Sequence, residues 1–587
     1  MDKLTFDWNL KDIFEKEELA SEQFENMKKD YAKLVDFKGK LKGREELLKY
    51  FEYNSFLSEK YSKLFAYIQL RLSLDGKDEF ANQMQEKISY YFNDFEPKIA
   101  FIEPEICSNS LRDLKLWKNQ KEFEEYEIVL DNLISKKKHS LDQKTNKLLS
   151  SIPSFGACSE AFDKFDNVDI KFGEVETGEG KKNLTPALYS LLLENPSQQI
   201  RSEAYDTMHK AYADHNFLLA SLYLSQTKEN NFFVEIRKYK SELDSACESI
   251  KVDPKIVPTL FKVVRDHLHL FYRFEKIKKR ALKLQDYYYF DNYATVCKEN
   301  HRYDYKEGAK LMLEALNVYG MDYVSTMKKA LTENWIDVYE KESKTTGGFS
   351  LGVYGMHPYI LLNWGNTFSD VVTLCHEMGH TMHSYYSNKF QPLEKSDYSI
   401  FVAEVASTVN ENLLNLYMLQ NAKTKQEKLF HVHNFLHRFY GSVYRQTMFE
   451  EFEHFVITSV ERKEPLSAQD LNKKYESLQK LYFGEDALCT EFSKYEWSRI
   501  PHFYSPYYVY KYATGFIAAT IIARNIFDQK EGYLEKYMNF LKAGCSVYPL
   551  DLLKSVEVDL MDEKTLEKGF EVYEEYLAEF ENLTKED

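Results

Sequence analysis

The stretch Ser369–Tyr386, SDVVTLCHEMGHTMHSYY, decides our interpretation of the fold. Apolar residues recur in it at helical spacing and Ser369 or Asp370 can cap a helix, so we expect one amphipathic helix here. His376 and His380 are four residues apart. Side chains at this spacing share one helix face, where both imidazoles can reach one zinc ion at about 2.0–2.1 Å. The stretch therefore predicts a metal-binding helix.

Glu377 directly follows the first histidine and points beside the metal rather than at it. A carboxylate in that place can take a proton from zinc-bound water, whose pKa the metal lowers to about 7. The alternative is two surface histidines on an ordinary helix. A preceding Gly-rich strand and an acidic residue downstream favour the catalytic interpretation, with Glu377 as general base.

A third protein ligand is expected, because catalytic zinc commonly has three and leaves one position for water. Glu404 opens a second helical pattern, in which the small residues Ala403 and Ala406 allow two helices to approach closely. Glu411 and Glu394 are weaker candidates, and the alternative is that Glu404 is a surface acid. We predict Glu404 as the third ligand.

His383 is a less suitable ligand. It lies seven residues after His376, about 10 Å along a helix axis at 1.5 Å per residue, which is too far to share the ion. We expect it to act around the metal or on the substrate side instead.

A Gly-rich stretch, Lys344–Trp364, precedes the helix and contains the apolar run Tyr359–Leu362. This run is the best strand candidate in the chain. Pro358 cannot donate to a β-ladder, which suits an edge strand or the beginning of a strand. An exposed edge can accept a peptide as an added strand. The alternative is an ordinary small sheet closed by turns.

The composition favours a mainly α fold. Gly (21) and Pro (13) are scarce among 587 residues, which favours long helices over turn-dense β architecture. A chain of this length exceeds one ordinary core, so we expect two or more lobes. A turn-rich stretch, Phe172–Pro186, is a hairpin or a connector. We place a boundary near residue 190, with an N-terminal helical lobe (1–190) and a catalytic lobe (191–587).

Charge and targeting features exclude several classes of partner. The net charge of −16 is spread along the chain, which argues against nucleic acid or anionic membrane. The start, MDKLTFD, has no apolar run typical of a signal peptide, and Ala513–Ala523 is shorter than the roughly 20 residues that span a bilayer. The seven cysteines are scattered, which fits reduced thiols. We expect a cytoplasmic protein without membrane contact or an obligatory protein partner.

A second cluster of chemistry lies in SRIPHFYSPYYVYKYATG (Ser498–Gly515). It contains one histidine and five tyrosines: His502, Tyr504, Tyr507, Tyr508, Tyr510 and Tyr512. These neutral donors can hydrogen-bond an oxyanion without competing for zinc, and such donors contribute several kcal/mol to transition-state stabilisation. Since the chain has 44 tyrosines, the alternative is a purely structural aromatic patch.

Taken together, these motifs resemble oligoendopeptidase F, in the thimet-oligopeptidase-like family of zinc peptidases. The resemblance covers most of the chain. Five ordered segments carry it: HPYILLNW (His357–Trp364), HEMGHTMHSYYS (His376–Ser387), DYSIFVAEVASTVNE (Asp397–Glu411), YRQTMFEEFE (Tyr444–Glu453) and IPHFYSPYYVYKYATG (Ile500–Gly515). Departures are small: Cys375 stands where an aliphatic residue is usual, and the Gly-rich loop before His357 looks shortened.

The resemblance implies a large two-lobed helical body around a deep channel, with a small β-sheet next to the zinc-binding helix. It implies one zinc ion per chain. The site residues carried over by motif are the metal ligands His376, His380 and Glu404, the base Glu377, and the transition-state donors His502, Tyr507 and Tyr510. We further expect His357, Tyr359 and Tyr504 to bind substrate.

We predict an endopeptidase that hydrolyses internal bonds of short peptides. Zinc polarises the scissile carbonyl and its water, and Glu377 takes the proton and then delivers it to the leaving amine. Enclosure by the lobes would exclude folded proteins. One alternative is a metallo-exopeptidase of dipeptidyl or mono-carboxypeptidase type, which needs a fixed charge for a substrate terminus. The other is a non-catalytic zinc-containing peptide-binding scaffold, in which Glu377 would have no use.

Overall fold

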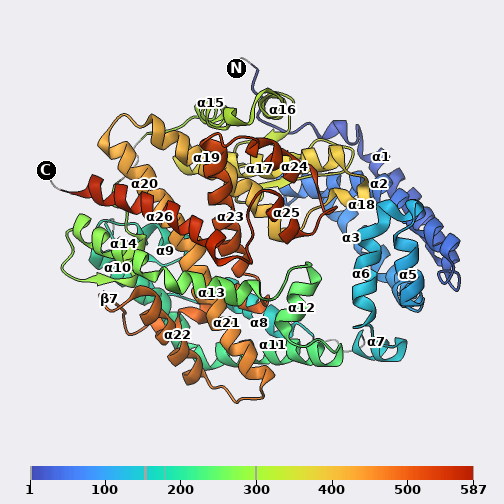
Figure 1. Cartoon of the computed structure of the whole chain (residues 1–587), viewed down its shortest axis with the longest axis horizontal. Helices are drawn as coiled ribbons and strands as arrows, with labels where there is room; N and C mark the ends of the chain where they lie inside the picture. Colours follow the sequence, from blue (N-terminus) through green and yellow to red (C-terminus); the bar gives the residue numbers. More distant parts are fainter. Residues whose placement is uncertain (1–2, 151–154, 179, 298–300, 586–587) are drawn as a thin grey trace. The chain divides into compact units, whose positions relative to one another are not determined.

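Helices make up most of the chain, and the strands are few and short (Figure 1). The computed structural model describes residues 3–150, 155–178, 180–297 and 301–585. Contacts divide the chain into two units, each assembled from three segments. The first unit contains residues 1–147, 301–414 and 522–557, and the second contains residues 148–300, 415–521 and 558–587. The prediction of a mainly α fold is confirmed.

The first unit consists of helices of varied length and one three-stranded sheet. Its helices are α1 (Glu17–Ala32), α2 (Arg44–Leu74), α3 (Glu79–Ile99), α4 (Ile102–Cys107), α5 (Leu111–Lys118), α6 (Glu127–Lys137), α15 (Tyr305–Ala315), α16 (Met321–Thr332), α17 (Phe368–Phe390), α18 (Leu393–Ser396), α24 (Tyr533–Lys542) and α25 (Pro549–Ser555). Helices α7 (Gln143–Ser150), α19 (Ile400–Asn421) and α23 (Tyr510–Phe527) contribute residues to both units.

The second unit is helical with two small sheets. Its helices are α8 (Ala157–Lys164), α9 (Pro186–Leu193), α10 (Gln198–Asp214), α11 (Asn216–Ile236), α12 (Glu242–Ser249), α13 (Ile256–Asp266), α14 (Leu268–Ala281), α20 (Lys425–Phe439), α21 (Arg445–Glu461), α22 (Ala468–Phe483) and α26 (Glu563–Thr584). Strands β3 (Tyr287–Tyr288) and β7 (Ala487–Leu488) pair in parallel. Strands β1 (Glu174–Thr177) and β2 (Gly180–Asn183) are antiparallel, so the turn-rich stretch forms a hairpin.

The predicted lobes, 1–190 and 191–587, divide the chain differently from these contact units. That division stays a prediction, as does the channel. No described helix is long and apolar enough to cross a membrane. No disulfide bond joins cysteines within the described residues.

Helix α17, which carries both histidines, begins with a reciprocal cap. Thr367 Oγ1 accepts a hydrogen bond from the Asp370 N–H (3.3 Å), and Asp370 Oδ2 accepts one from the Thr367 N–H (2.7 Å). This capping box gives partners to N–H groups that a helix start otherwise leaves unsatisfied. The cap is therefore Thr367, whereas Ser369 lies inside the helix and Asp370 completes the box.

The sheet of the first unit packs against α17 and has the strand order β4-β6-β5. Strand β6 (Tyr359–Leu361) pairs in parallel with β4 (Ile336–Asp337) and antiparallel with β5 (Phe349–Leu351). The strand predicted at this apolar run and a small sheet beside the helix that carries His376 and His380 are confirmed. The prediction of an edge strand is wrong, because all three residues of β6 are buried between two neighbouring strands. Strands β4 and β5 lie at the two edges instead.

Candidate active site

Three predicted ligands meet at the facing surfaces of α17 and α19. His376 Nε2 lies 3.2 Å from His380 Nε2 and 3.3 Å from Glu404 Oε2, and His380 Nε2 lies 3.6 Å from Glu404 Oε2. All three side chains are partly exposed. They form the one group of at least three His, Cys, Asp or Glu side chains with metal-binding geometry among the described residues.

The spacing of these donor atoms fits a metal ion. Ligands placed tetrahedrally at about 2.0–2.1 Å from zinc lie about 3.3 Å from one another, and the observed triangle has sides of 3.2, 3.3 and 3.6 Å. Two imidazoles and one carboxylate are a typical donor set for catalytic zinc, with a fourth position left for water. The chain's own residues therefore match the implied metal in type, number and distance.

Close approach of the two helices depends on Gly379. A Cβ atom placed there would lie 2.5 Å from Ser407 Cα and 2.8 Å from Ala406 O on α19. Both are backbone atoms, so no side-chain movement could relieve the overlap. We predicted close packing from the small residues Ala403 and Ala406 on α19. The structure shows that Gly379 is the small residue on α17 at this contact.

Glu411, a weaker ligand candidate, occupies a different place. Its carboxylate contacts Nδ1 of His376, the ring nitrogen away from the donor triangle. Such a partner fixes the tautomer and orientation of a metal-binding imidazole. Glu394 is also outside the triangle and accepts a hydrogen bond from Ser55. Glu411 is thus a positioning residue for His376.

Replacing Glu411 with Gln is expected to weaken zinc binding by about 10- to 100-fold, because the imidazole loses its charged partner. The measurement is competition with a chelator of known zinc affinity, and Glu531→Gln, at an exposed position, is the control. An unchanged zinc dissociation constant in Glu411→Gln would contradict the positioning role.

Glu377 lies beside the triangle and is only 6% exposed. Burial raises the pKa of its carboxyl group, and the neighbouring His376 and His380 partly offset this effect. Its Oε1 would lie 3.5 Å from a Cβ placed on Gly348, the residue before edge strand β5. A side chain at this position would therefore lie against the carboxylate, which a glycine avoids.

His383 is packed in the core of the first unit and does not reach the triangle or solvent. Its side chain is fully buried and stacks on Tyr398, with ring centroids 3.7 Å apart, and lies near Phe540. Burial lowers the pKa of the imidazole to about 3, so the ring is neutral. The prediction that it is not a ligand agrees with this position, and full burial leaves no surface for a role on the substrate side. A role around the metal stays a prediction, and Tyr398, on which His383 stacks, donates to the His380 carbonyl at 3.5 Å.

The three residues expected to bind substrate have different environments. Tyr359 is fully buried in a core cluster with Trp8 and Leu361, so its side chain offers no surface to a peptide. His357 stacks on Trp335 at 4.9 Å and is partly exposed. Tyr504, in the second unit, stacks on Phe162 at 4.5 Å and is also partly exposed. A substrate-binding role stays a prediction for His357 and Tyr504.

His502 lies in the second unit, where two partly exposed tyrosines surround it. Tyr512 OH lies 3.4 Å from His502 Nε2, and the Tyr508 ring lies 5.8 Å from the imidazole. Tyr508 and Tyr512 also contact each other, with ring centroids 5.6 Å apart. The sequence interpretation included both tyrosines in the cluster but did not select them. Their spacing of four residues, which favours one helix face, was the available signal.

Tyr507 and Tyr510, the predicted donors, are each only 1% exposed. Tyr507 OH bonds His454 Nδ1 at 2.9 Å. Their backbone N–H groups donate to buried carboxyl groups, Tyr507 to Glu453 at 2.8 Å and Tyr510 to Glu450 at 3.0 Å. In this structure the two tyrosines and their acidic partners hold the segment that carries Tyr508.

A third buried carboxyl group, Glu242, gives the second unit a pH-dependent stability. Burial raises its pKa to about 8, and Glu461 adds to the effect. Because the folded state holds this proton more tightly than the unfolded state, the contribution is complete below about pH 4.5 and is lost as the pH rises through about 8. Wild type should therefore lose about 1.4 kcal/mol per pH unit relative to Glu242→Gln between these values.

Chemical denaturation of both proteins at pH 5, 6.5 and 8 measures this difference. If the free energies of unfolding of wild type and Glu242→Gln depend on pH in the same way, the pKa of Glu242 is not raised in the folded protein.

The chain is similar to known oligopeptidases over nearly its whole length. A family model described as peptidase family M3 matches residues 191–572, and one described as oligopeptidase F matches residues 105–172. Oligopeptidase PepF of Bacillus subtilis (strain 168) is 34% identical over 581 residues, which cover 98% of this chain and 87% of that protein. Group B oligopeptidase PepB of Streptococcus agalactiae is 32% identical over 582 residues, covering 98% and 97%. The crystal structure of oligoendopeptidase-F from Enterococcus faecium matches with a TM-score of 0.75 at 28% identity, covering 96% of this chain and 98% of that one.

Proposed function

Because the chain belongs to peptidase family M3 and is a metalloendopeptidase, we propose that it hydrolyses internal bonds of short peptides with one zinc ion. The ion is held by His376, His380 and Glu404. The observation that carries this proposal is the triangle of donor atoms with sides of 3.2 to 3.6 Å beside a buried glutamate. A cytoplasmic location is part of the proposal, and the absence of disulfide bonds within the described residues is consistent with it.

Each step is assigned to residues of the chain. A zinc ion at this site supplies a Lewis acid and a water molecule of lowered pKa. Glu377 accepts the proton of the attacking water and then donates it to the leaving amine nitrogen. Glu411 keeps His376 in the orientation that the ion needs. The edge strand β5 offers main-chain hydrogen bonds to a substrate backbone, and Gly348 leaves room for it next to Glu377.

Stabilisation of the developing negative charge is proposed for the His502 region, as the family resemblance implies. The partly exposed Tyr508 and Tyr512 are better available for donation to a substrate oxygen than Tyr507 and Tyr510, whose hydroxyl groups are buried. Tyr508→Phe and Tyr512→Phe should therefore reduce kcat more than Tyr510→Phe.

The function is tested with a peptide library of graded length, analysed by mass spectrometry with and without a zinc chelator. The expected products are internal fragments of short peptides, which disappear when the chelator is present and return when zinc is restored. Removal of single residues or dipeptides from the ends would instead show a metallo-exopeptidase, and cleavage that is insensitive to the chelator would disprove the metal mechanism.

A further inference from the structure

A polar cavity of about 340 Å³ lies within the second unit, where two of the sequence motifs meet. Arg445 and Gln446 come from the start of α21. Arg499 and His502 come from the segment before α23, and all four side chains line the cavity. The proposed function gives no role to the motif that contains Arg445.

Two guanidinium groups share one buried carboxylate at this cavity. Arg445 Nη2 donates to Glu496 Oε1 at 2.6 Å, and Arg499 Nη1 lies 3.8 Å from the same oxygen. Tyr475 OH donates to the other oxygen of Glu496 at 3.0 Å. Burial alone would raise the pKa of Glu496, but the charge of Arg445 and its neighbours outweighs burial and lowers the pKa to about 2. Glu496 is therefore charged and is the direct partner of Arg445, whereas Arg499 also interacts with Asp166 and Tyr212.

Hydrogen-bond donors remain available at the cavity wall. A guanidinium group has five N–H donors, and within the described residues Arg445 makes one hydrogen bond, to Glu496. The side chains of Arg445 and Arg499 are 17% and 25% exposed, and both line the cavity. Paired, planar N–H donors match a carboxylate in charge and shape.

The negative side chain that lines the cavity does not cancel the attraction of the two arginines for a carboxylate. Glu194 lines the cavity but is exposed, so solvent screens its charge. His502 and His437 also line the cavity, and burial lowers the pKa of both imidazoles, to about 3 for His437. The charged side chains that line the cavity are thus Arg445, Arg499 and the exposed Glu194, and Glu496 lies behind the two arginines.

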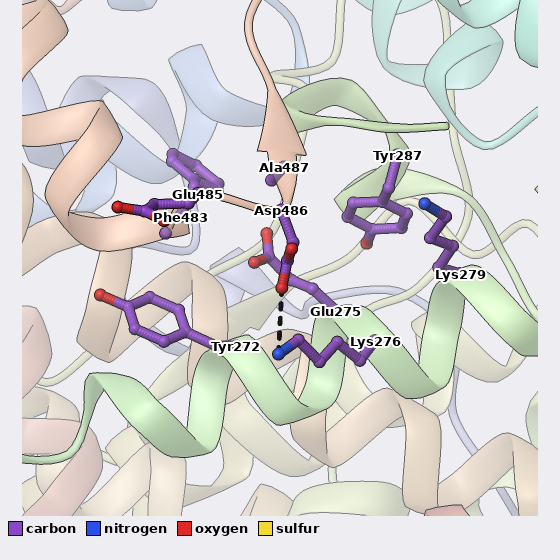
Figure 2. Close-up of a pocket in the computed structure, with 10 residues that line it drawn as sticks. Tyr272, Glu275, Lys276, Lys279, Tyr287, Phe483, Glu485, Asp486 and Ala487 are labelled. Atoms are coloured by element: carbon purple, nitrogen blue, oxygen red, sulfur yellow. Dashed lines mark ion pairs between the residues drawn. The ribbon is translucent and has the colours of Figure 1, made fainter. Parts of the chain in front are cut away.

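A smaller cavity in the second unit, of about 60 Å³, is lined by both acidic and basic side chains (Figure 2). Lys276 is paired with Asp486 at 3.0 Å, and the acidic Glu275 and Glu485 also line the wall with Lys279. Burial raises the pKa of Glu275 well above its usual range, so Glu485 and Asp486 balance Lys276 and Lys279, and no surplus positive charge remains. The smaller cavity is therefore no candidate for an anionic ligand.

We propose that the cavity lined by Arg445 and Arg499 binds a carboxylate of the peptide substrate, provided by the C-terminus or by an Asp or Glu side chain. The inference rests on the proposed function, because it takes the ligand to be the peptide that His502 contacts. A fixed contact to this carboxylate would determine which peptide bond is cleaved. The enzyme would cut at a set distance from the C-terminus of the substrate or from its acidic residue.

Four versions of one fluorogenic peptide test the proposal in wild type. In the first pair the peptide ends in a free carboxylate or in an amide. In the second pair it contains an internal Glu or, at the same position, Gln. In one pair, the peptide with the carboxylate is expected to have a KM at least tenfold lower than its neutral partner. That pair shows whether the C-terminus or an acidic side chain provides the carboxylate. Equal KM values within both pairs would overturn the proposal.

Arg499→Gln is expected to abolish that difference by raising KM for the carboxylate form alone, whereas Arg499→Lys should restore part of it. Arg462→Gln, which alters an exposed arginine paired with Glu464, is the matched control. A carboxylate preference that survives in Arg499→Gln would overturn the proposal.

Calorimetric binding of the same peptides to Glu377→Gln separates this inference from the proposed function. Carboxylate-dependent binding without any cleavage by wild type would contradict only the proposed function. Cleavage by wild type with carboxylate-independent binding would contradict only the cavity assignment.

Discussion

Glu377→Gln is expected to lower kcat for an internally quenched peptide by about 10²- to 10⁴-fold while the protein keeps its zinc. Glutamine has nearly the shape of glutamate but cannot take a proton from water. Glu377 is not one of the three residues whose donor atoms form the triangle, so its replacement leaves the metal ligands unchanged. The measurements are steady-state kinetics and the zinc content of the purified variant.

Glu531→Gln controls for the purification and for a change of one charge, since Glu531 is exposed and distant in sequence from every predicted site residue. The mechanism fails if Glu377→Gln retains its zinc and cuts the peptide at the wild-type rate. Loss of zinc from this variant would instead show that Glu377 contributes to metal binding.

The parts of the site that follow from local spacing could be predicted from the sequence. His376 and His380 share one helix face because they are four residues apart, and Glu404 was recognisable from the small residues around it. The apolar run at β6 predicted a strand. Its place in the centre of the sheet was not predictable, because strand order depends on β4 and β5, which have only two and three residues.

The parts that depend on tertiary packing could not be predicted. His383 and Tyr359 belong to motifs with catalytic resemblance, yet both are fully buried, and no local pattern distinguishes a buried aromatic ring from an exposed one. The contact of Glu411 with His376 requires the register between α17 and α19. Selection among Tyr507, Tyr508, Tyr510 and Tyr512 likewise depends on which hydroxyl groups are covered in the fold.

Gly379→Ala is expected to weaken zinc binding by up to about 10²-fold, because the register between the two helices sets the metal site. The added methyl group would meet Ser407 Cα at 2.5 Å, Ala406 O at 2.8 Å and Ser407 N at 2.9 Å, all of them backbone atoms. Helix α19 must then move away from α17 by an appreciable fraction of an ångström. Glu404 lies on the same turn of α19, and a displacement of about 1 Å in a functional site costs roughly 10²-fold.

Gly515→Ala is the matched control, because Gly515 also lies in a helix and a Cβ atom there would meet nothing within 4 Å. Alanine is favoured over glycine in helices by about 1 kcal/mol, so this control should be as stable as wild type or more stable, with unchanged zinc affinity. Chelator competition on both variants gives the zinc dissociation constants, and circular dichroism verifies that Gly379→Ala is still folded. A folded Gly379→Ala protein with wild-type zinc affinity would mean that the distance between α17 and α19 does not control the site, and that Glu404 reaches the metal independently of their contact.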